Sequence, residues 1–261
     1  MRRVDGVETE LMTGGRGAPL LYLHAADGIE EAQPLLTRLA ETFTVYAPSH
    51  PGFGGSELPR SISSVDDLAY FYLGLLEELN LQQTILVGVS LGGWIAAEIA
   101  VKNTGRLSCL VLAAPVGAKF GGRETRDIAD LYSMTDKEMA ACLYAEVRAP
   151  PDYTTMPVDR VTRQVRNRES FTLFGWSPTL FDPKLRQRLH RIDVPTLLLS
   201  GDRDRVVASD YGASFTQEIR GAQAQTIVDA GHYLHADRPL EVADAIGSFS
   251  KRAARPVTAT A

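Results

Sequence analysis

Residues 84–103 read TILVGVSLGGWIAAEIAVKN, and this stretch decides the fold that the sequence predicts. It begins with an apolar run typical of a buried strand and continues with a segment of helical period. Between the two lies Gly88-Val89-Ser90-Leu91-Gly92, which puts a serine on the turn from a strand into a helix. Such a turn holds the hydroxyl exposed in a strained conformation, and the small glycines beside it prevent clashes. An idle serine on a glycine-rich turn is the alternative.

Outward from this stretch, short apolar runs alternate with segments of helical period. The predicted strands are residues 20–24, 44–49, 84–90, 107–114, 195–201 and 225–231. The predicted helices are residues 63–79, 91–103, 208–219 and 237–250, the first with an S-x-x-D capping pattern from Ser63 to Asp66. Strands that are almost continuously apolar favour a sheet covered on both faces. We therefore predict an α/β fold: a mostly parallel, doubly wound sheet with helices on both faces.

The alternation stops between residues 116 and 181, which contain helical pieces and no strand pattern. A segment of this length is too long for a simple connection. We predict a helical cap at 116–181, inserted into a core domain made of residues 1–115 and 182–261. The tail, residues 251–261, is expected to be frayed because it is small, polar and proline-bearing.

The predicted cap carries two groups of residues that bear on a substrate. The apolar group is a candidate wall for an acyl pocket, although the underside of a packed helix is the alternative: Val161, Val165, Phe171, Phe174 and Trp176. The basic group is interpreted as a solvated helix face, with recognition of an anionic substrate as the alternative: Arg160, Arg163, Arg166 and Arg168.

Composition excludes several other classes of protein. The chain is 44% hydrophobic and 23% charged, with a net charge of -5 and no basic cluster, which argues against a nucleic-acid partner. No apolar run has the length of a membrane span or a signal peptide, so a cytoplasmic location is expected. The two cysteines, Cys109 and Cys142, are isolated and fit a reducing compartment. The expected partner is a small-molecule substrate, and the sequence is also compatible with a homo-oligomer.

A serine nucleophile needs a base, and the base needs a third group to orient it. Of the five histidines, His232 follows the last predicted strand, where a loop can bring it to Ser90. We expect His235 to face the following helix or solvent, while His50 and His190 are interpreted as structural. Asp204 is the predicted acid because it stands beyond the strand 195–201, whereas the neighbouring Asp202 is expected to cap the turn. The chain order serine, acid, histidine is the order that a strand-to-helix serine turn of this kind predicts.

With these residues the sequence resembles the α/β-hydrolase fold superfamily along nearly its whole length. The matching segments are LLYLHAAD, YAPSHPGFGGSELP, GVSLGG, LLLSGDRD and DAGHYLHADRPLEVADAI. The resemblance implies a cap, no cofactor and no metal, and an oxyanion hole made by two backbone N–H groups. These N–H groups belong to Leu91, after the nucleophile, and to Ala26, two residues after His24. His24 and Tyr233 are further candidates for the substrate pocket.

The sequence departs from the family pattern at the start of the oxyanion loop. The usual His-Gly pair is His24-Ala25 here, and Asp27 places a carboxylate next to Ala26. A carboxylate that pointed inward would repel an oxyanion, so we expect Asp27 to point to solvent. The alternative is a hole tuned for chemistry other than simple ester hydrolysis.

The resemblance implies a serine hydrolase that cleaves a carboxylic ester, or a related lactone or thioester. Ser90 argues against the epoxide hydrolases and haloalkane dehalogenases of this fold, which use aspartate. The main alternative is a carbon–carbon bond hydrolase acting on ring-fission diketones. Those enzymes usually carry tryptophan where this chain has Tyr233. Amide cleavage and cofactor-free lyase chemistry also fit the triad, and a ligand-binding receptor without turnover is a further alternative.

Overall fold

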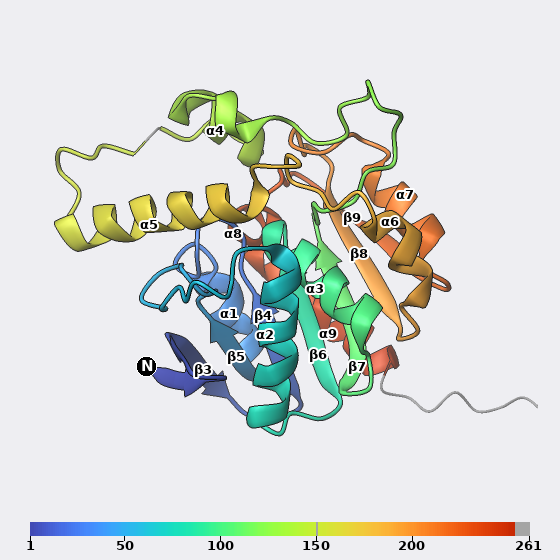
Figure 1. The fold of residues 1–261 in the computed structure, drawn as a ribbon. Helices are drawn as coiled ribbons and strands as arrows, with labels where there is room; N and C mark the ends of the chain where they lie inside the picture. The colour runs from blue at the N-terminus through green and yellow to red at the C-terminus, as the bar shows by residue number, and fades with distance from the viewer. Residues whose placement is uncertain (150, 254–261) are drawn as a thin grey trace, which may run out of the picture.

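The structure is a computed structural model, and it describes residues 1–149 and 151–253 (Figure 1). The fraying expected for the tail concerns mainly residues 254–261, which lie outside the described residues.

A seven-stranded sheet forms the centre of the protein. Its strands are, in spatial order, β3 (Leu11–Gly15), β5 (Thr44–Pro48), β4 (Pro19–Leu23), β6 (Thr84–Val89), β7 (Leu107–Ala113), β8 (Thr196–Gly201) and β9 (Gln223–Ile227). Only β3 runs antiparallel to its neighbour, so the prediction of a mostly parallel α/β sheet is confirmed.

The sequence analysis did not predict the N-terminal strands. β1 (Arg2–Val4) and β2 (Val7–Thr9) form a small hairpin that precedes β3. These strands have three, three and five residues, and β3 ends in the exposed pair Gly14-Gly15. They lack the continuous apolar run by which the buried strands were recognised.

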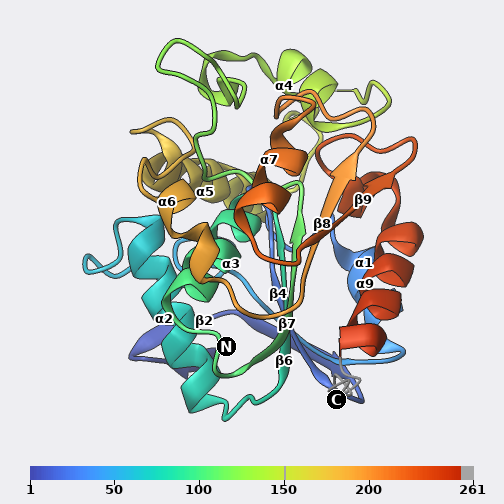
Figure 2. The same cartoon turned by 90° about the vertical axis from the view of Figure 1, so that its right-hand side faces the viewer.

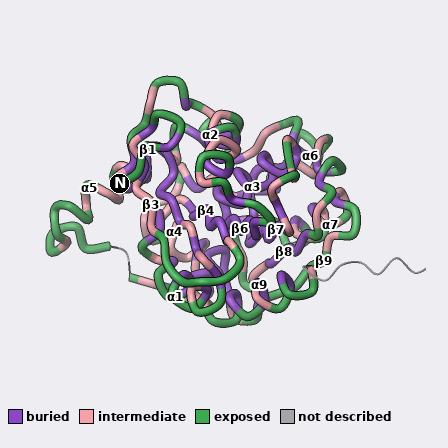
Figure 3. The backbone as a smooth tube through the Cα atoms, turned by 90° about the horizontal axis from the view of Figure 1, so that it is seen from below, coloured by how far each residue is buried: buried purple, intermediate pink, exposed green. Residues whose placement is uncertain are grey.

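Helices cover both faces of the sheet. α2 (Val65–Glu78) and α3 (Leu91–Lys102) pack together on one face, and α1 (Gln33–Ala40) and α9 (Pro239–Ala253) pack on the other (Figure 2). The shorter helices are α6 (Leu185–Arg188), α7 (Tyr211–Glu218) and α8 (Leu234–Asp237), with the 3-10 turns η1 (Leu131–Ser133) and η2 (Leu189–Arg191). Buried residues gather along the central strands (Figure 3), which explains why the apolar runs identified these strands.

The predicted helix cap at 63–66 was wrong by one residue. The side chain of Ser64 accepts a hydrogen bond from the N–H of Asp67, and the carboxylate of Asp67 accepts one from the N–H of Ser64. Adjacent serines and adjacent aspartates give the same S-x-x-D spacing in both registers, so the sequence could not choose between them, and the structure uses the second.

The segment between β7 and β8 contains α4 (Asp136–Leu143) and α5 (Val158–Gly175). Both helices lie above the end of the sheet toward which the parallel strands run (Figure 1). We refer to residues 116–181 as the insertion; its action as a separate cap stays a prediction. In the part of the chain that the structure describes, no helix has both the length and the apolar composition that a bilayer span requires.

Candidate active site

Ser90 has an unusual backbone conformation at the turn between β6 and α3. Its φ of 52° and ψ of −111° lie in a region that residues with a side chain rarely adopt. A Cβ on Gly88 would lie 2.2 Å from the carbonyl oxygen of Gly92, and one on Gly92 would lie 2.1 Å from that of Leu23. Both positions therefore require glycine, as the sequence predicts.

Ser90, His232 and Asp204 form a chain of hydrogen bonds at the carboxyl edge of the sheet. The hydroxyl of Ser90 lies 2.8 Å from Nε2 of His232, and Nδ1 of His232 lies 2.9 Å from Oδ2 of Asp204. The neutral imidazole with its proton on Nδ1 satisfies both contacts, because it donates to the carboxylate and accepts from the hydroxyl. The structure thus brings together the three predicted residues.

Asp204 is held as a carboxylate by its surroundings. Burial alone would raise the pKa of Asp204, but His232 and the backbone N–H groups of Val206 and Val207 hold the pKa below its ordinary value. These two N–H groups donate to Oδ1 at 2.8 and 3.2 Å, which leaves Oδ2 for the histidine. Asp202 instead accepts from the N–H of Ala230 in the histidine loop at 3.1 Å, which differs from the local turn cap expected for it.

The two backbone N–H groups predicted for the oxyanion hole belong to Leu91 and Ala26. Leu91 is the first residue of α3, so its N–H has no acceptor within the helix. Ala26 lies in a tight turn closed by a 3.2 Å hydrogen bond from the N–H of Gly28 to the carbonyl of Ala25. Gly28 has a φ of 93°, which explains the glycine at that position.

A stacked pair of histidines supports this loop from behind. The rings of His24 and His50 are 3.7 Å apart, and the N–H of His50 donates to Nε2 of His24 at 2.9 Å. Nδ1 of His24 donates to the carbonyl of Ala25, and the hydroxyl of Tyr72 donates to Nδ1 of His50. Burial lowers the pKa of His24 to about 4 and that of His50 well below 6.5, so both rings are neutral.

A cavity of about 550 Å³ lies between the insertion and the oxyanion loop. Its wall is largely apolar and includes Leu131, Tyr132, Met134, Met139 and Leu143. Two predicted pocket residues, Phe171 and Tyr233, also line the cavity. Ser90 is 5% exposed and does not line it; the cavity instead reaches Ala26 and Tyr233, the residue after His232.

Five residues predicted for the substrate pocket do not line this cavity: His24, Val161, Val165, Phe174 and Trp176. Several other residues of α5 line the cavity, among them Gln164, Asn167 and Phe171. Val165 is 49% and Trp176 59% exposed. Phe174 is buried against Phe53, and His24 stacks on His50.

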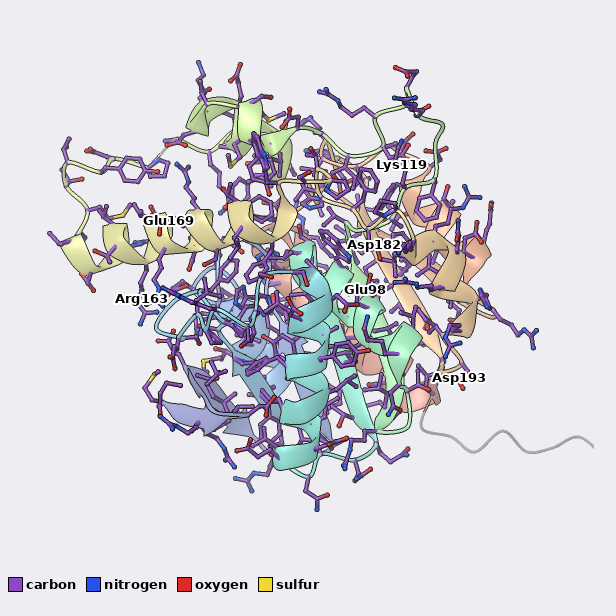
Figure 4. The ribbon with its side chains drawn as sticks, viewed as in Figure 1. Glu98, Lys119, Arg163, Glu169, Asp182 and Asp193 are labelled. Carbon is purple, nitrogen blue, oxygen red and sulfur yellow. The ribbon has the colours of Figure 1, made fainter. Side chains whose placement is uncertain are left out.

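The interpretation of the basic residues of α5 as a solvated face is wrong for Arg163 and Arg166, which are partly buried, whereas Arg160 and Arg168 are more than half exposed. Arg163 projects toward the core (Figure 4) and binds Glu10 through two nitrogens, at 2.7 and 2.9 Å. Arg166 donates to the carbonyl of Ser56, and Arg168 pairs with Asp136. These arginines attach the insertion to the core and to itself.

The arginines nearest the cavity are also paired with carboxylates. Arg160 lies 3.9 Å from Glu31, and Arg148 lies 3.8 Å from Glu31 and 3.1 Å from Asp237. Every arginine that lines the cavity is therefore within 4.0 Å of a carboxylate of the protein.

The orientation expected for Asp27 and His235 was also wrong. His235 is fully buried, and its Nε2 lies 3.2 Å from Oδ2 of Asp27. The Asp27 side chain is 14% exposed and turns toward this ring rather than toward solvent. The two residues are 208 positions apart in the chain, so no local pattern could reveal the contact.

Asn167 is a buried residue of the site that the sequence analysis missed. Its Nδ2 donates to the carbonyl of Asp27, and its Oδ1 accepts from the N–H of Gly54, both at 2.9 Å. One side chain of α5 thus fixes two loops at the edge of the sheet. The local sequence shows only a polar residue within a predicted helix, and it does not reveal that this side chain is buried.

Within residues 1–149 and 151–253, no cluster of three or more His, Cys, Asp or Glu side chains is arranged to hold a metal ion.

A parallel sheet whose carboxyl edge carries a serine turn, a histidine loop and an aspartate loop is the architecture of the α/β hydrolases. The chain belongs to the alpha/beta hydrolase family, which it matches over residues 17–245.

Individual relatives are distant and differ in their named activities. The chain is 26% identical to 2-hydroxymuconate semialdehyde hydrolase of Pseudomonas sp. (strain CF600), with 94% of this chain and 90% of that protein covered. It is 28% identical to an sn-1-specific diacylglycerol lipase of Mus musculus, with 92% and 83% covered. Its fold is similar to that of the meta-cleavage product hydrolase CumD, with a TM-score of 0.79, 19% identity, and 96% and 97% of the two chains covered.

Proposed function

We propose that the protein is a serine hydrolase that cleaves a carboxylic ester, with Ser90 as nucleophile, His232 as general base and Asp204 as the orienting acid. The hydrogen bonds of 2.8 and 2.9 Å that join these three side chains carry the proposal. A histidine so placed can take the serine proton as the hydroxyl attacks, and the carboxylate stabilises the imidazolium that forms.

The reaction has two halves. Oγ of Ser90 attacks the ester carbonyl carbon while Nε2 of His232 takes the hydroxyl proton, and the N–H groups of Leu91 and Ala26 stabilise the oxyanion. The intermediate collapses as His232 protonates the leaving alkoxide, which departs as the alcohol and leaves an acyl group on Ser90. Water then attacks this acyl group with His232 as base, which releases the acid and restores Ser90. No step needs a metal or cofactor.

The cavity favours a small-molecule ester with an uncharged acyl chain. Most of its wall area is apolar, and each arginine on it lies within 4.0 Å of a carboxylate of the protein, which weakens its attraction for an anionic substrate. Because the cavity reaches Ala26 and Tyr233, a bound chain can direct its carbonyl toward the serine from there. A lactone or thioester presents the same electrophilic carbonyl.

Cleavage of a carbon–carbon bond in a ring-fission diketone is the second candidate. The named activity of the Pseudomonas relative supports it. Two observations argue against it. Tyr233 follows the histidine at the position where these enzymes usually carry tryptophan. Such diketones also carry a carboxylate, and the arginines of the cavity are already paired with carboxylates of the protein.

Two experiments test the proposal. A fluorophosphonate probe should label the wild-type protein and the control Ser214→Ala, and should leave Ser90→Ala unlabelled. Ser90→Ala should lose kcat for 4-nitrophenyl esters by a factor on the order of a million. If Ser90→Ala keeps most of its ester hydrolysis while its thermal unfolding is unchanged, the nucleophile is misassigned.

A comparison of substrates separates the two candidates. We expect kcat/KM to vary with acyl chain length across 4-nitrophenyl acetate, butyrate, octanoate and dodecanoate. We expect little turnover of a vinylogous diketone of the ring-fission type. The reverse result, rapid diketone cleavage and slow ester cleavage, would establish the second candidate.

A further inference from the structure

Three buried polar atoms beside the oxyanion loop have no hydrogen-bond partner among the described residues. They are Oδ1 of Asp27, Nδ1 of His235 and the hydroxyl of Tyr22. Buried polar groups are nearly always satisfied, so a cluster of exceptions calls for an explanation. Asp27 is central to this cluster, because it also lines the cavity and directly follows Ala26, whose N–H is proposed to bind the oxyanion.

The charge of Asp27 is weakly compensated. Its one ionic contact among the described residues is His235, which counters the charge only when that ring is protonated. Glu30 and Glu31 follow on the same loop and line the same cavity. The arginines of the cavity bind Glu31, Glu30 or acids farther away, and none lies within salt-bridge distance of Asp27.

Neighbouring side chains respond to this negative charge. Burial raises the pKa of Tyr22 well above 10.0, and the charge of Asp27 raises it further. The pKa of Tyr233, which lines the cavity beside the proposed base, is raised by the same two causes in the same order. The carboxylate of Asp27 therefore contributes a negative electrostatic potential at the hydroxyls of Tyr22 and Tyr233.

We propose that Asp27 is a specificity-determining residue, which disfavours acyl chains with a negative charge near the scissile ester and favours neutral or positively charged chains. The inference rests on the proposed ester hydrolysis. Oδ1 of Asp27 is buried and has no hydrogen-bond partner among the described residues, so its negative charge is poorly screened where Asp27 lines the cavity. In a partly buried site a unit charge several ångströms away changes relative binding on the order of tenfold.

Three ethyl esters of matched length test this inference. Monoethyl succinate is anionic, ethyl butyrate is neutral and ethyl 4-(trimethylammonio)butyrate is cationic, and the acid released from each is followed by titration at constant pH. The wild type should cleave the anionic ester with the lowest kcat/KM. Asp27→Asn, which keeps the shape and removes the charge, should raise the anionic-to-neutral ratio of kcat/KM about tenfold and lower the cationic-to-neutral ratio.

Asp27→Ser provides a second neutral variant, and Asp244→Asn is the matched control. Asp244 is exposed on α9 and pairs with Arg38, so its loss should leave both ratios unchanged. If the wild type cleaves ethyl butyrate but both Asp27 variants keep the wild-type ratios, this inference is wrong and the proposed function stands. A wild type that prefers the anionic ester also overturns it. If the wild type cleaves neither these three esters nor any of the 4-nitrophenyl esters, the proposed function fails and this inference fails with it.

Discussion

The carboxylate of Asp237 accepts a hydrogen bond of 2.9 Å from the backbone N–H of Gly231, the residue before His232. The same oxygen accepts from the N–H of Ala145 in the insertion at 2.8 Å, and the other oxygen lies 3.1 Å from Arg148. The N–H of Tyr233 also donates to the carbonyl of Leu143 at 2.8 Å. The loop of the proposed base is thus bound to the insertion on both sides of the histidine.

Asp237→Ala should therefore reduce catalysis more than it reduces stability. Without the carboxylate, the loop loses its anchor and His232 moves relative to Ser90. A displacement of about 1 Å can lower the rate about a hundredfold. We expect kcat for 4-nitrophenyl esters of every chain length to fall tenfold to a hundredfold. Asp244→Ala is the control, and a loss confined to the melting temperature, with kcat unchanged in the folded protein, would contradict the prediction.

Asp204→Asn should lower kcat by about 10⁴ at neutral pH. The amide can present an N–H to Nδ1 of His232, which favours the tautomer whose Nε2 carries the proton and cannot accept from Ser90. Steady-state ester hydrolysis measures the loss. Asp202→Asn is the matched control, since its only described partner is the N–H of Ala230, and it should keep kcat near the wild-type value. Equal losses in the two variants would exclude Asp204 as the orienting acid.

Glu10→Gln should destabilise the protein in a pH-dependent manner. The hydrogen bond from Arg163 is the largest cause that lowers the pKa of Glu10, from 4.5 to about 2. A lowered pKa means that the carboxylate contributes stability above about pH 4.5, and that this contribution disappears as the pH falls toward 2.

Urea denaturation at several pH values measures this effect. The variant should be less stable than the wild type by about 1 kcal/mol at pH 7, a value discounted because the ion pair is partly exposed. The difference should shrink as the pH is lowered from 4.5 to 2. A difference that stays constant over this range would show that the charge of Glu10 is not its cause.

The stacked histidines predict a loss of stability in mild acid. Burial lowers the pKa of His24 from 6.5 to about 4, so the folded protein keeps this ring neutral while the unfolded chain takes up a proton below pH 6.5. Stability is therefore full above pH 6.5 and decreases as the pH falls to about 4.

The decrease should be at most about 3.5 kcal/mol for His24, from about 1.4 kcal/mol for each unit of pKa. His24→Gln should be less stable at pH 7 and should show a smaller decrease across this window. His190→Gln, at an exposed position, should follow the wild-type curve. Parallel curves for wild type and His24→Gln would rule out the buried neutral histidine as the source.

Several features could be predicted from the sequence because they depend on neighbours in the chain. The six predicted strands are found within a few residues of their predicted limits. Five of them are apolar runs that are mostly buried, whereas β9 is an edge strand with four of its five residues exposed. The turn at Ser90 could be predicted because its glycines are next to the serine. Asp204 and His232 could be chosen because the carboxyl ends of parallel strands meet at one edge of a sheet.

The environment of individual residues in the insertion was predicted less well, because the side of a helix that is buried depends on the elements that pack against it. Val161 and Val165 are apolar yet do not line the cavity, whereas Arg163 and Asn167 are polar yet hold α5 to the core. Hydrophobicity on an isolated helix cannot distinguish a polar residue in water from one with a buried partner. Those partners, Glu10 and Gly54, are more than 100 positions away.

The sequence by itself determined the strand order along the chain, the strained serine turn and the candidate triad, because short-range sterics and the direction of parallel strands leave few alternatives. Only the tertiary structure decided that Asp27 meets His235, that Asp237 joins the histidine loop to the insertion, and which residues surround the cavity. Each of these contacts joins loops that are distant in sequence. Their geometry depends on how the insertion packs over the sheet, which no local pattern encodes.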